Sequence, residues 1–72
     1  MEDIQFTIDY EQEVDGRWIA EVVELPGALA YGQTSGAAIA RVKALALRVV
    51  AERLEHGEEL PTWMSITFAE AT

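Results

Sequence analysis

Apolar and polar residues alternate along the first part of the chain. From residue 4 to residue 10 every second position is apolar, a period of two that is typical of a strand with one face on a core and the other in water. The apolar residues are Ile4, Phe6, Ile8 and Tyr10. Asp15-Gly16 follows, a pair that favours a tight hairpin because both residues accept positive φ angles. The pattern predicts a strand over residues 3–13, a turn over 14–17 and an antiparallel second strand.

The second predicted strand carries apolar groups on both faces. Trp18, Ala20 and Val22 share one face, which we expect to meet a helix. The other face consists of Ile19, Glu21 and Val23. It is either a modest exposed patch or half of a subunit contact, and the small core expected for a chain of this size favours the contact.

Beyond the second strand, turn residues separate two further elements. Leu25-Pro26-Gly27 ends the strand, because proline has no N–H for the ladder and glycine allows a sharp change of direction. A short third strand is predicted over residues 28–32, with Gly32 letting the chain leave the sheet. Residues 36–56 are rich in helix formers. Thr34 or Ser35 is the predicted N-cap of this helix, and Gly57 the glycine that ends it.

The predicted helix has more apolar surface than one sheet needs. On a helical wheel of about 100° per residue one broad face is apolar. That face consists of Ala38, Ile39, Val42, Leu45, Ala46, Val49 and Val50. Leu47 and Leu54 lie on a flank bordered by alanines, while Arg48 and Glu52 have the spacing of a helical ion pair. The flank around Leu47 and Leu54 is a candidate contact with another subunit.

Residues 63–69 alternate again and predict a fourth strand, with Met64, Ile66 and Phe68 inward and Trp63, Ser65 and Thr67 outward. Crossover connections through a helix are right-handed and join parallel strands. The fourth strand therefore pairs with the free side of the first. We predict an α+β fold of the form β-β-β-α-β, in which one four-stranded mixed sheet of order 3-2-1-4 carries one helix on one face. All 72 residues form a single domain.

The charge of the chain is strongly acidic. Its formal net charge is -8, with 13 acidic and 5 basic residues, eight of the acidic ones before Leu25. Such a balance argues against direct binding of nucleic acid, whose phosphates need a basic face. It fits either a basic partner or solubility alone. No signal peptide pattern is present at the N-terminus, and the apolar run over residues 44–51 is too short to span a membrane, so a cytoplasmic location is expected.

Candidate chemistry is sparse. The chain has no cysteine, which excludes a thiol nucleophile and thiolate metal ligands. His56 is the single histidine, and Thr34 and Ser35 lie roughly 30 Å from it, at the other end of the helix. We therefore expect no catalytic residue, no metal site and no cofactor. A nuclease that uses Asp9 and Glu52 is the remaining enzyme hypothesis.

Three short motifs follow one another along the chain, each occurring once. They include the strand and corner DGRWIAEVVELPG, the GQT before the helix and the HGEELP after it. In this order they resemble the HicB-like antitoxin family. The residues that carry the resemblance are Asp15, Gly16, Trp18, Ala20, Val22, Leu25, Pro26, Gly27, Gly32, Thr34, Gly57, Glu58 and Pro61.

The resemblance implies a fold like a truncated ribonuclease H without its nuclease site. It also implies self-association and binding to a small basic HicA-type toxin that cleaves mRNA. Antitoxins of the family usually carry a C-terminal DNA-binding segment, which the 72 residues do not contain, so autoregulation is not expected. The predicted partner-binding residues are Asp9, Glu11, Ile19, Glu21, Val23, Leu47 and Leu54. The alternative is a self-associating structural or regulatory adaptor without a toxin partner.

Overall fold

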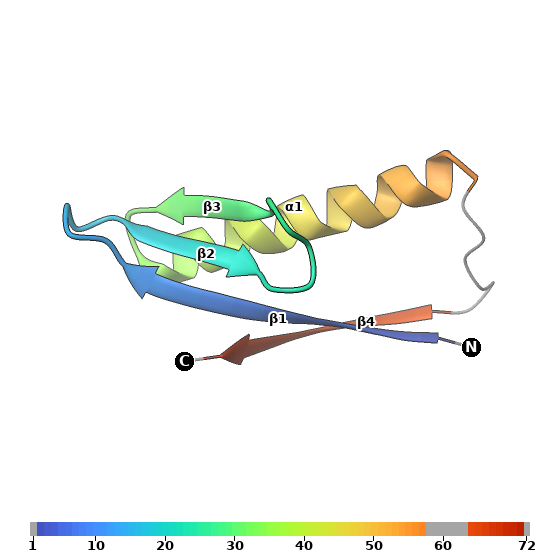
Figure 1. Cartoon of the computed structure of the whole chain (residues 1–72), viewed down its shortest axis with the longest axis horizontal. Coiled ribbons are helices and arrows are strands. Elements are labelled where there is room, and N and C mark those ends of the chain that lie inside the picture. Colours follow the sequence, from blue (N-terminus) through green and yellow to red (C-terminus); the bar gives the residue numbers. More distant parts are fainter. Residues whose placement is uncertain (1, 58–63, 72) are drawn as a thin grey trace.

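Four strands and one helix make up the chain in the computed structural model, which describes residues 2–57 and 64–71. In chain order they are β1 (Glu2–Gln12), β2 (Trp18–Val22), β3 (Leu29–Gly32), α1 (Ser35–Glu55) and β4 (Met64–Ala71) (Figure 1). The strands form one mixed sheet of order β3-β2-β1-β4. β2 is antiparallel to β1 and to β3, whereas β4 is parallel to β1. The predicted α+β fold and its strand order are confirmed.

The β1–β2 hairpin is wider than the tight turn that the sequence predicted. Residues 13–17 connect the two strands, and the N–H of Gly16 donates to the carbonyl of Glu13 over 3.0 Å. Gly16 has a φ of 94°, but Asp15 does not share this positive φ. Instead, the Asp15 carboxylate accepts from the N–H of Arg17 over 3.1 Å and closes the turn with its side chain. The expectation of positive φ at both residues was therefore wrong.

The Leu-Pro-Gly corner returns the chain from β2 to β3. The N–H of Leu25 donates to the carbonyl of Val22, and the N–H of Ala28 donates to the carbonyl of Leu25. Gly27 supplies the positive φ, 89°, that this double turn requires. Both Leu25 and Ala28 are buried, so the corner contributes to the core as well as reversing the chain.

The helix, predicted over residues 36–56, begins and ends one residue earlier, at Ser35 and Glu55. Of the two predicted caps, Thr34 is the N-cap, and its hydroxyl accepts from the N–H of Ala37 over 3.1 Å. At the other end Gly57 has a φ of 73°. The start of the helix packs tightly on β3, because a Cβ at Gly32 would lie 2.5 Å from the backbone nitrogen of Ala38. Only glycine fits between β3 and the first turn of α1.

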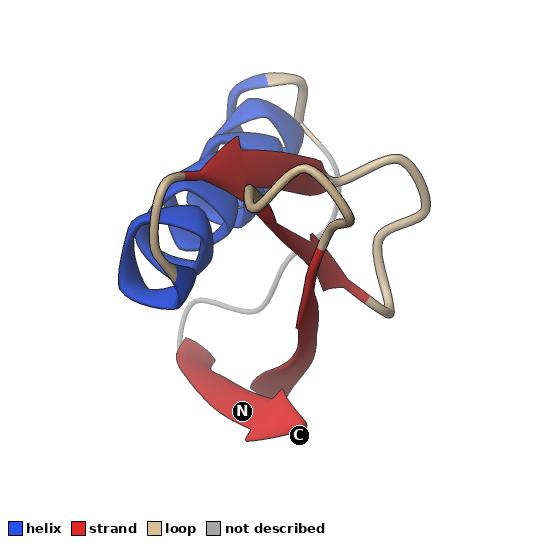
Figure 2. Cartoon of the chain, turned by 90° about the vertical axis from the view of Figure 1, so that its left-hand side faces the viewer, coloured by secondary structure: helices blue, strands red, loops and turns tan. Residues whose placement is uncertain are grey.

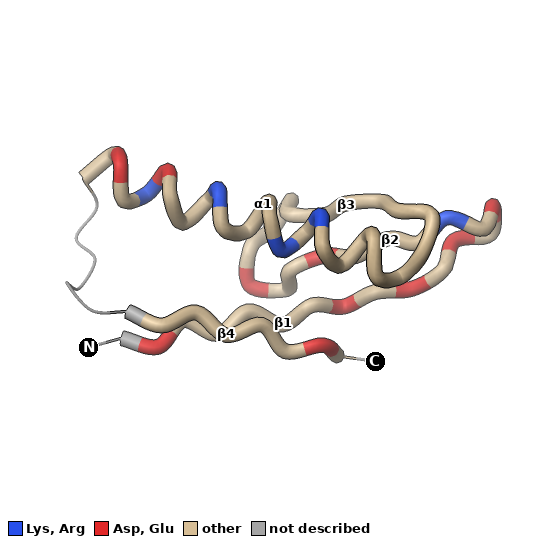
Figure 3. Tube along the Cα trace, turned by 180° about the vertical axis from the view of Figure 1, so that it is seen from behind, with Lys and Arg blue, Asp and Glu red and all other residues tan. Residues whose placement is uncertain are grey.

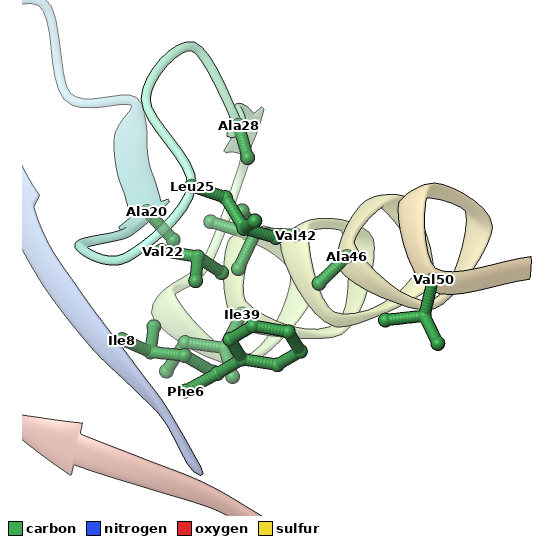
Figure 4. Close-up of a cluster of buried hydrophobic side chains, with 11 residues drawn as sticks. Phe6, Ile8, Ala20, Val22, Leu25, Ala28, Ile39, Val42, Ala46 and Val50 are labelled. Carbon is green, nitrogen blue, oxygen red and sulfur yellow. The ribbon is translucent and has the colours of Figure 1, made fainter. Parts of the chain in front are cut away.

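The core lies between α1 and one face of the sheet (Figure 4). Its largest fully buried side chains are Ile8, Val22 and Val42, each of which contributes roughly 1.5–3 kcal/mol by burial. The predicted apolar faces of the first two strands and of the helix supply most of it. The buried residues are Phe6, Ile8, Ala20, Val22, Leu25, Ala28, Ala38, Ile39, Val42, Ala46 and Val50.

The helix covers the sheet unevenly. It packs chiefly on β3 and β2 and less on β1, while β4 lies at the far side of the sheet (Figure 2). On β4, Ile66 and Phe68 are only partly buried, and Phe68 meets Phe6 with 5.7 Å between ring centroids. These two residues point inward as predicted. Trp63 and the side chain of Met64, which was also predicted to point inward, lie outside what the structure describes. Among the described residues, no helix is long and apolar enough to cross a membrane.

Candidate functional site

The face of the sheet turned away from α1, here called the outer face, gathers four of the seven predicted partner-binding residues on β1 and β2, and Val23 continues it beyond the end of β2. Asp9 pairs with Glu21 and Glu11 with Ile19 across the β1–β2 ladder. Alternation along a strand places these residues opposite the buried Ile8, Ala20 and Val22. Together with Tyr10, these four residues line a shallow depression of about 140 Å³. The structure therefore unites Asp9, Glu11, Ile19 and Glu21 on one surface.

The carboxylates of the outer face are not neutralised within the described chain. Within residues 2–57 and 64–71 the ion pair is Arg17 with Asp15, at 2.8 Å. Asp9 and Glu21 stand directly opposite each other on neighbouring strands, and both are exposed. Like charges in this arrangement destabilise a sheet. An external cation placed between them would relieve that repulsion.

Strand β3 extends the outer face with two large side chains that were not among the predicted partner-binding residues. Leu29 pairs with Glu21, and Tyr31 pairs with Ile19. They are 43% and 37% exposed, and the Arg17 guanidinium lies 4.5 Å from the centre of the Tyr31 ring. The alternation in the sequence LAYG is the signal that marks them. Their place beside β2 depends on the register across the corner, which alternation alone does not give.

Val23 lies one residue beyond β2, and its N–H donates to the carbonyl of Thr7 over 2.9 Å. Its side chain is 58% exposed, so it continues the outer face past the acidic residues. The next residue, Glu24, is held in place: its carboxylate accepts from the N–H of Thr7 at 2.7 Å and from the hydroxyl of Thr7 at 2.8 Å. These hydrogen bonds lower the pKa of Glu24 below the ordinary value of a glutamate.

Leu47 and Leu54 do not join the outer face. They lie on the solvent side of α1 and are 46% and 51% exposed. Figure 2 shows that α1 lies on one side of the sheet. The exposed side of α1, with Leu47 and Leu54, is therefore on the opposite side of the domain from the outer face. The predicted partner-binding residues therefore fall on two separate surfaces.

Within the described residues, no three of His, Asp and Glu come together as metal ligands. His56 caps the end of α1, where its Nδ1 lies 2.8 Å from the carbonyl of Glu52. The predicted ion pair between Arg48 and Glu52 is not among the interactions of the described residues. Glu58 and Glu59, which extend the acidic helix end in the sequence, lie outside them.

Comparisons of the chain with protein-family models, with curated proteins and with solved structures found no match. The resemblance to HicB-like antitoxins therefore stays a prediction from the motif residues. Of those residues, Asp15 and Gly16 form the hairpin turn, Leu25 to Gly27 the corner, and Thr34 the helix cap. Glu58 and Pro61 lie outside the described residues.

Proposed function

We propose that this chain is a non-enzymatic protein-binding module of the HicB-like antitoxin type, which neutralises a small basic HicA-type toxin. Two features support the proposal. The motif residues that resemble the family form the turn, the corner and the cap of a β-β-β-α-β domain. The outer face is acidic and exposed, as a docking surface for a basic protein requires.

The single observation that carries the proposal is the adjacent pair Asp9 and Glu21. The two carboxylates oppose each other on neighbouring strands without a cation in the described chain. A lysine or arginine of a partner gains attraction from both and removes the repulsion between them. Glu11 lies two pairs further along the same ladder, at the next position on this face, so a partner with several cations is favoured over a single bound ion.

The apolar side chains beside the carboxylates give the surface the composition of a protein interface. Ile19 stands between Glu11 and Tyr31 across three strands, and Leu29 stands beside Glu21. Interfaces typically combine such an apolar centre, often with tyrosine, and a charged rim. A free metal ion or a small cation would not use these side chains.

Binding at this surface would neutralise the toxin by competition. A toxin that cleaves mRNA holds the RNA phosphates on cationic side chains. The outer face offers carboxylates to the same cations, and its apolar residues add contacts that RNA lacks. Occupation of the cationic surface excludes the RNA, so no reaction by this chain is needed.

The test is an RNA cleavage assay with a small basic HicA-type toxin. The wild-type chain should form a complex with it and stop cleavage. Glu21→Lys should weaken the complex by roughly tenfold or more, since one charge pair becomes a repulsion. Glu52→Lys is the matched control, because it changes the net charge equally but lies on α1. Undiminished cleavage without a complex, or equal loss in both variants, would reject the proposal.

A self-associating adaptor without a toxin partner is the second candidate. The exposed Leu47 and Leu54 on α1 favour it, because they lie away from the outer face and are not explained by toxin binding. The adaptor hypothesis predicts self-association together with no binding of any basic toxin. The assay above separates the two, since only an antitoxin protects the RNA.

A further inference from the structure

The solvent side of α1 carries a continuous apolar row, here called the helix seam. Its five residues are all exposed and recur at alternating steps of four and three. They are Ala40, Ala44, Leu47, Ala51 and Leu54. The exposed side of a helix on a sheet is ordinarily polar. Five apolar positions in register therefore need a partner.

The helix seam lies almost opposite the buried face of α1. At about 100° per residue, its centre is turned by roughly 140° from the centre of the buried positions. The buried positions include Ala38, Val42 and Ala46, which contact the sheet. A partner on the seam therefore touches neither the core nor the outer face, and the outer face remains free to bind a second protein.

The spacing of the helix seam matches the surface of another helix. Steps of four and three are the heptad repeat by which two helices pack side by side. The alanines let the two backbones approach closely, and Leu47 and Leu54 fill the spaces between them. A strand or an irregular loop has a different period and would not match all five positions.

The charge of the chain opposes a second copy at the outer face more strongly than at α1. Residues 35–55 carry four basic and two acidic side chains, whereas the rest of the chain carries one basic and eleven acidic (Figure 3). Two copies that meet at the outer face bring carboxylates together. Two copies that meet at α1 keep these acidic surfaces apart. The segments that then meet have a small net positive charge, and their basic and acidic side chains can pair with each other.

The charges beside the helix seam select the relative direction of the helices. Arg41, Arg48 and Glu55 lie on one flank at steps of seven. Arg41 donates through its Nη1 to the carbonyl of Tyr31 within the same chain, over 2.7 Å. In an antiparallel pair, Arg41 of each copy lies at the level of Glu55 of the other, because both are seven residues from Arg48, and its remaining guanidinium N–H groups can donate to that carboxylate. A parallel pair would instead put like charges at the same level. Near the axis, Glu52 lies one turn from Arg48 and offsets the two arginines.

We propose that the helix seam joins two copies of this chain, packed antiparallel about a twofold axis near Arg48. Such an isologous contact uses the same residues from both copies and closes at the dimer. The dimer has four layers, sheet, helix, helix and sheet, with the two outer faces pointing away from each other. This inference does not depend on the proposed toxin partner.

Sedimentation velocity over a range of concentrations tests the contact. The wild-type chain should pass from monomer to dimer, and Leu47→Glu with Leu54→Glu should raise the dimer Kd by roughly 100-fold or more. Leu29→Glu is the matched control, because Leu29 is similarly exposed but lies on the outer face. It should leave the dimer intact. A circular dichroism melt of each variant checks that it folds.

Two results would overturn the proposal. One is a wild-type chain that stays monomeric at every concentration. The other is a folded Leu47→Glu/Leu54→Glu variant that still dimerises. In that second case Thr67→Lys, which adds a charge to the edge strand β4, locates the contact: loss of the dimer places it at the sheet edge.

Cysteine cross-linking tests the direction of the helices, since the chain has no native cysteine. Arg41→Cys and Glu55→Cys should each fail to cross-link alone, because in an antiparallel pair the two copies of either residue are roughly 20 Å apart along the axis. A mixture of the two variants should form the mixed disulfide, which needs Cα atoms within about 7 Å. Efficient disulfides of Arg41→Cys with itself would show a parallel pair and contradict the proposal.

Discussion

The outer face of the sheet and the helix seam of α1 differ in both charge and pattern. The outer face carries directly opposed carboxylates, Asp9 and Glu21, beside a few apolar side chains. The helix seam has no charge within it, and its apolar residues follow a helical repeat. Opposed carboxylates repel a second copy and attract cations, whereas a heptad repeat fits another helix. One small domain thus presents two surfaces suited to different partners.

The largest expected effect comes from Gly32, where the sheet and α1 meet. Gly32→Ala places a Cβ at 2.5 Å from the backbone nitrogen of Ala38 and must displace the start of the helix. Overpacking against backbone should lower the free energy of unfolding by roughly 2–3 kcal/mol. Urea denaturation followed by circular dichroism measures it. Because both surfaces depend on this packing, both binding activities should weaken together.

Gly36→Ala is the control for this substitution. A Cβ at Gly36 meets only the Thr34 hydroxyl, at 3.9 Å, within the first turn of α1. Replacing a helical glycine by alanine should raise the free energy of unfolding by roughly 0.5–1 kcal/mol. Equal destabilisation by both substitutions would contradict the close packing of β3 on α1.

A smaller effect separates the two surfaces. Glu21→Lys turns the like-charged pair with Asp9 into an opposite-charged pair, which should raise the free energy of unfolding by roughly 0.2–1 kcal/mol. The same variant should keep the dimer while losing affinity for a basic partner. Urea denaturation at low salt measures the first effect. A destabilised Glu21→Lys variant would mean that Glu21 already has a favourable partner in the native state.

The smallest expected effect concerns pH and the Glu24–Thr7 hydrogen bonds. The pKa of Glu24 is lowered in the folded chain, so Glu24 stabilises the fold above the ordinary glutamate pKa of about 4.3. That contribution is lost as the pH falls through the folded-state pKa. The backbone N–H of Thr7 is the larger cause of the lowered pKa and its hydroxyl the smaller one. Thr7→Val removes only the hydroxyl donor, so it should partly flatten the dependence of stability on pH below about 5. Thermal melts at pH 3 to 7 measure it, and an unchanged slope would contradict this origin.

The elements of the fold follow from short-range patterns that the sequence contains in full. Alternation of apolar and polar residues marks β1 and β2. The Thr34 cap and Gly57 mark the two ends of α1. The handedness of crossover connections then places β4 beside β1. The hairpin was less predictable. Asp-Gly permits several turns, and the hydrogen bond from Arg17 to the Asp15 side chain selected one without positive φ at Asp15.

The candidate site was only partly predictable, because it depends on register. Alternation placed Asp9, Glu11, Ile19 and Glu21 on solvent-facing positions, and the hairpin made them neighbours. Leu29 and Tyr31 join them through a register that the corner sets with its own hydrogen bonds. The hydrogen bonds between the Glu24 carboxylate and Thr7 join residues 17 apart in sequence, and no local pattern indicates them.

Sedimentation velocity of two variants, each alone and mixed with the HicA-type toxin, tests most directly whether the two surfaces act separately. Leu47→Glu/Leu54→Glu should be a folded monomer that still binds the toxin. Glu21→Lys should be a dimer that binds it at least roughly tenfold more weakly. Loss of both dimer and toxin binding in either folded variant would contradict the account, because it would place both activities on one surface.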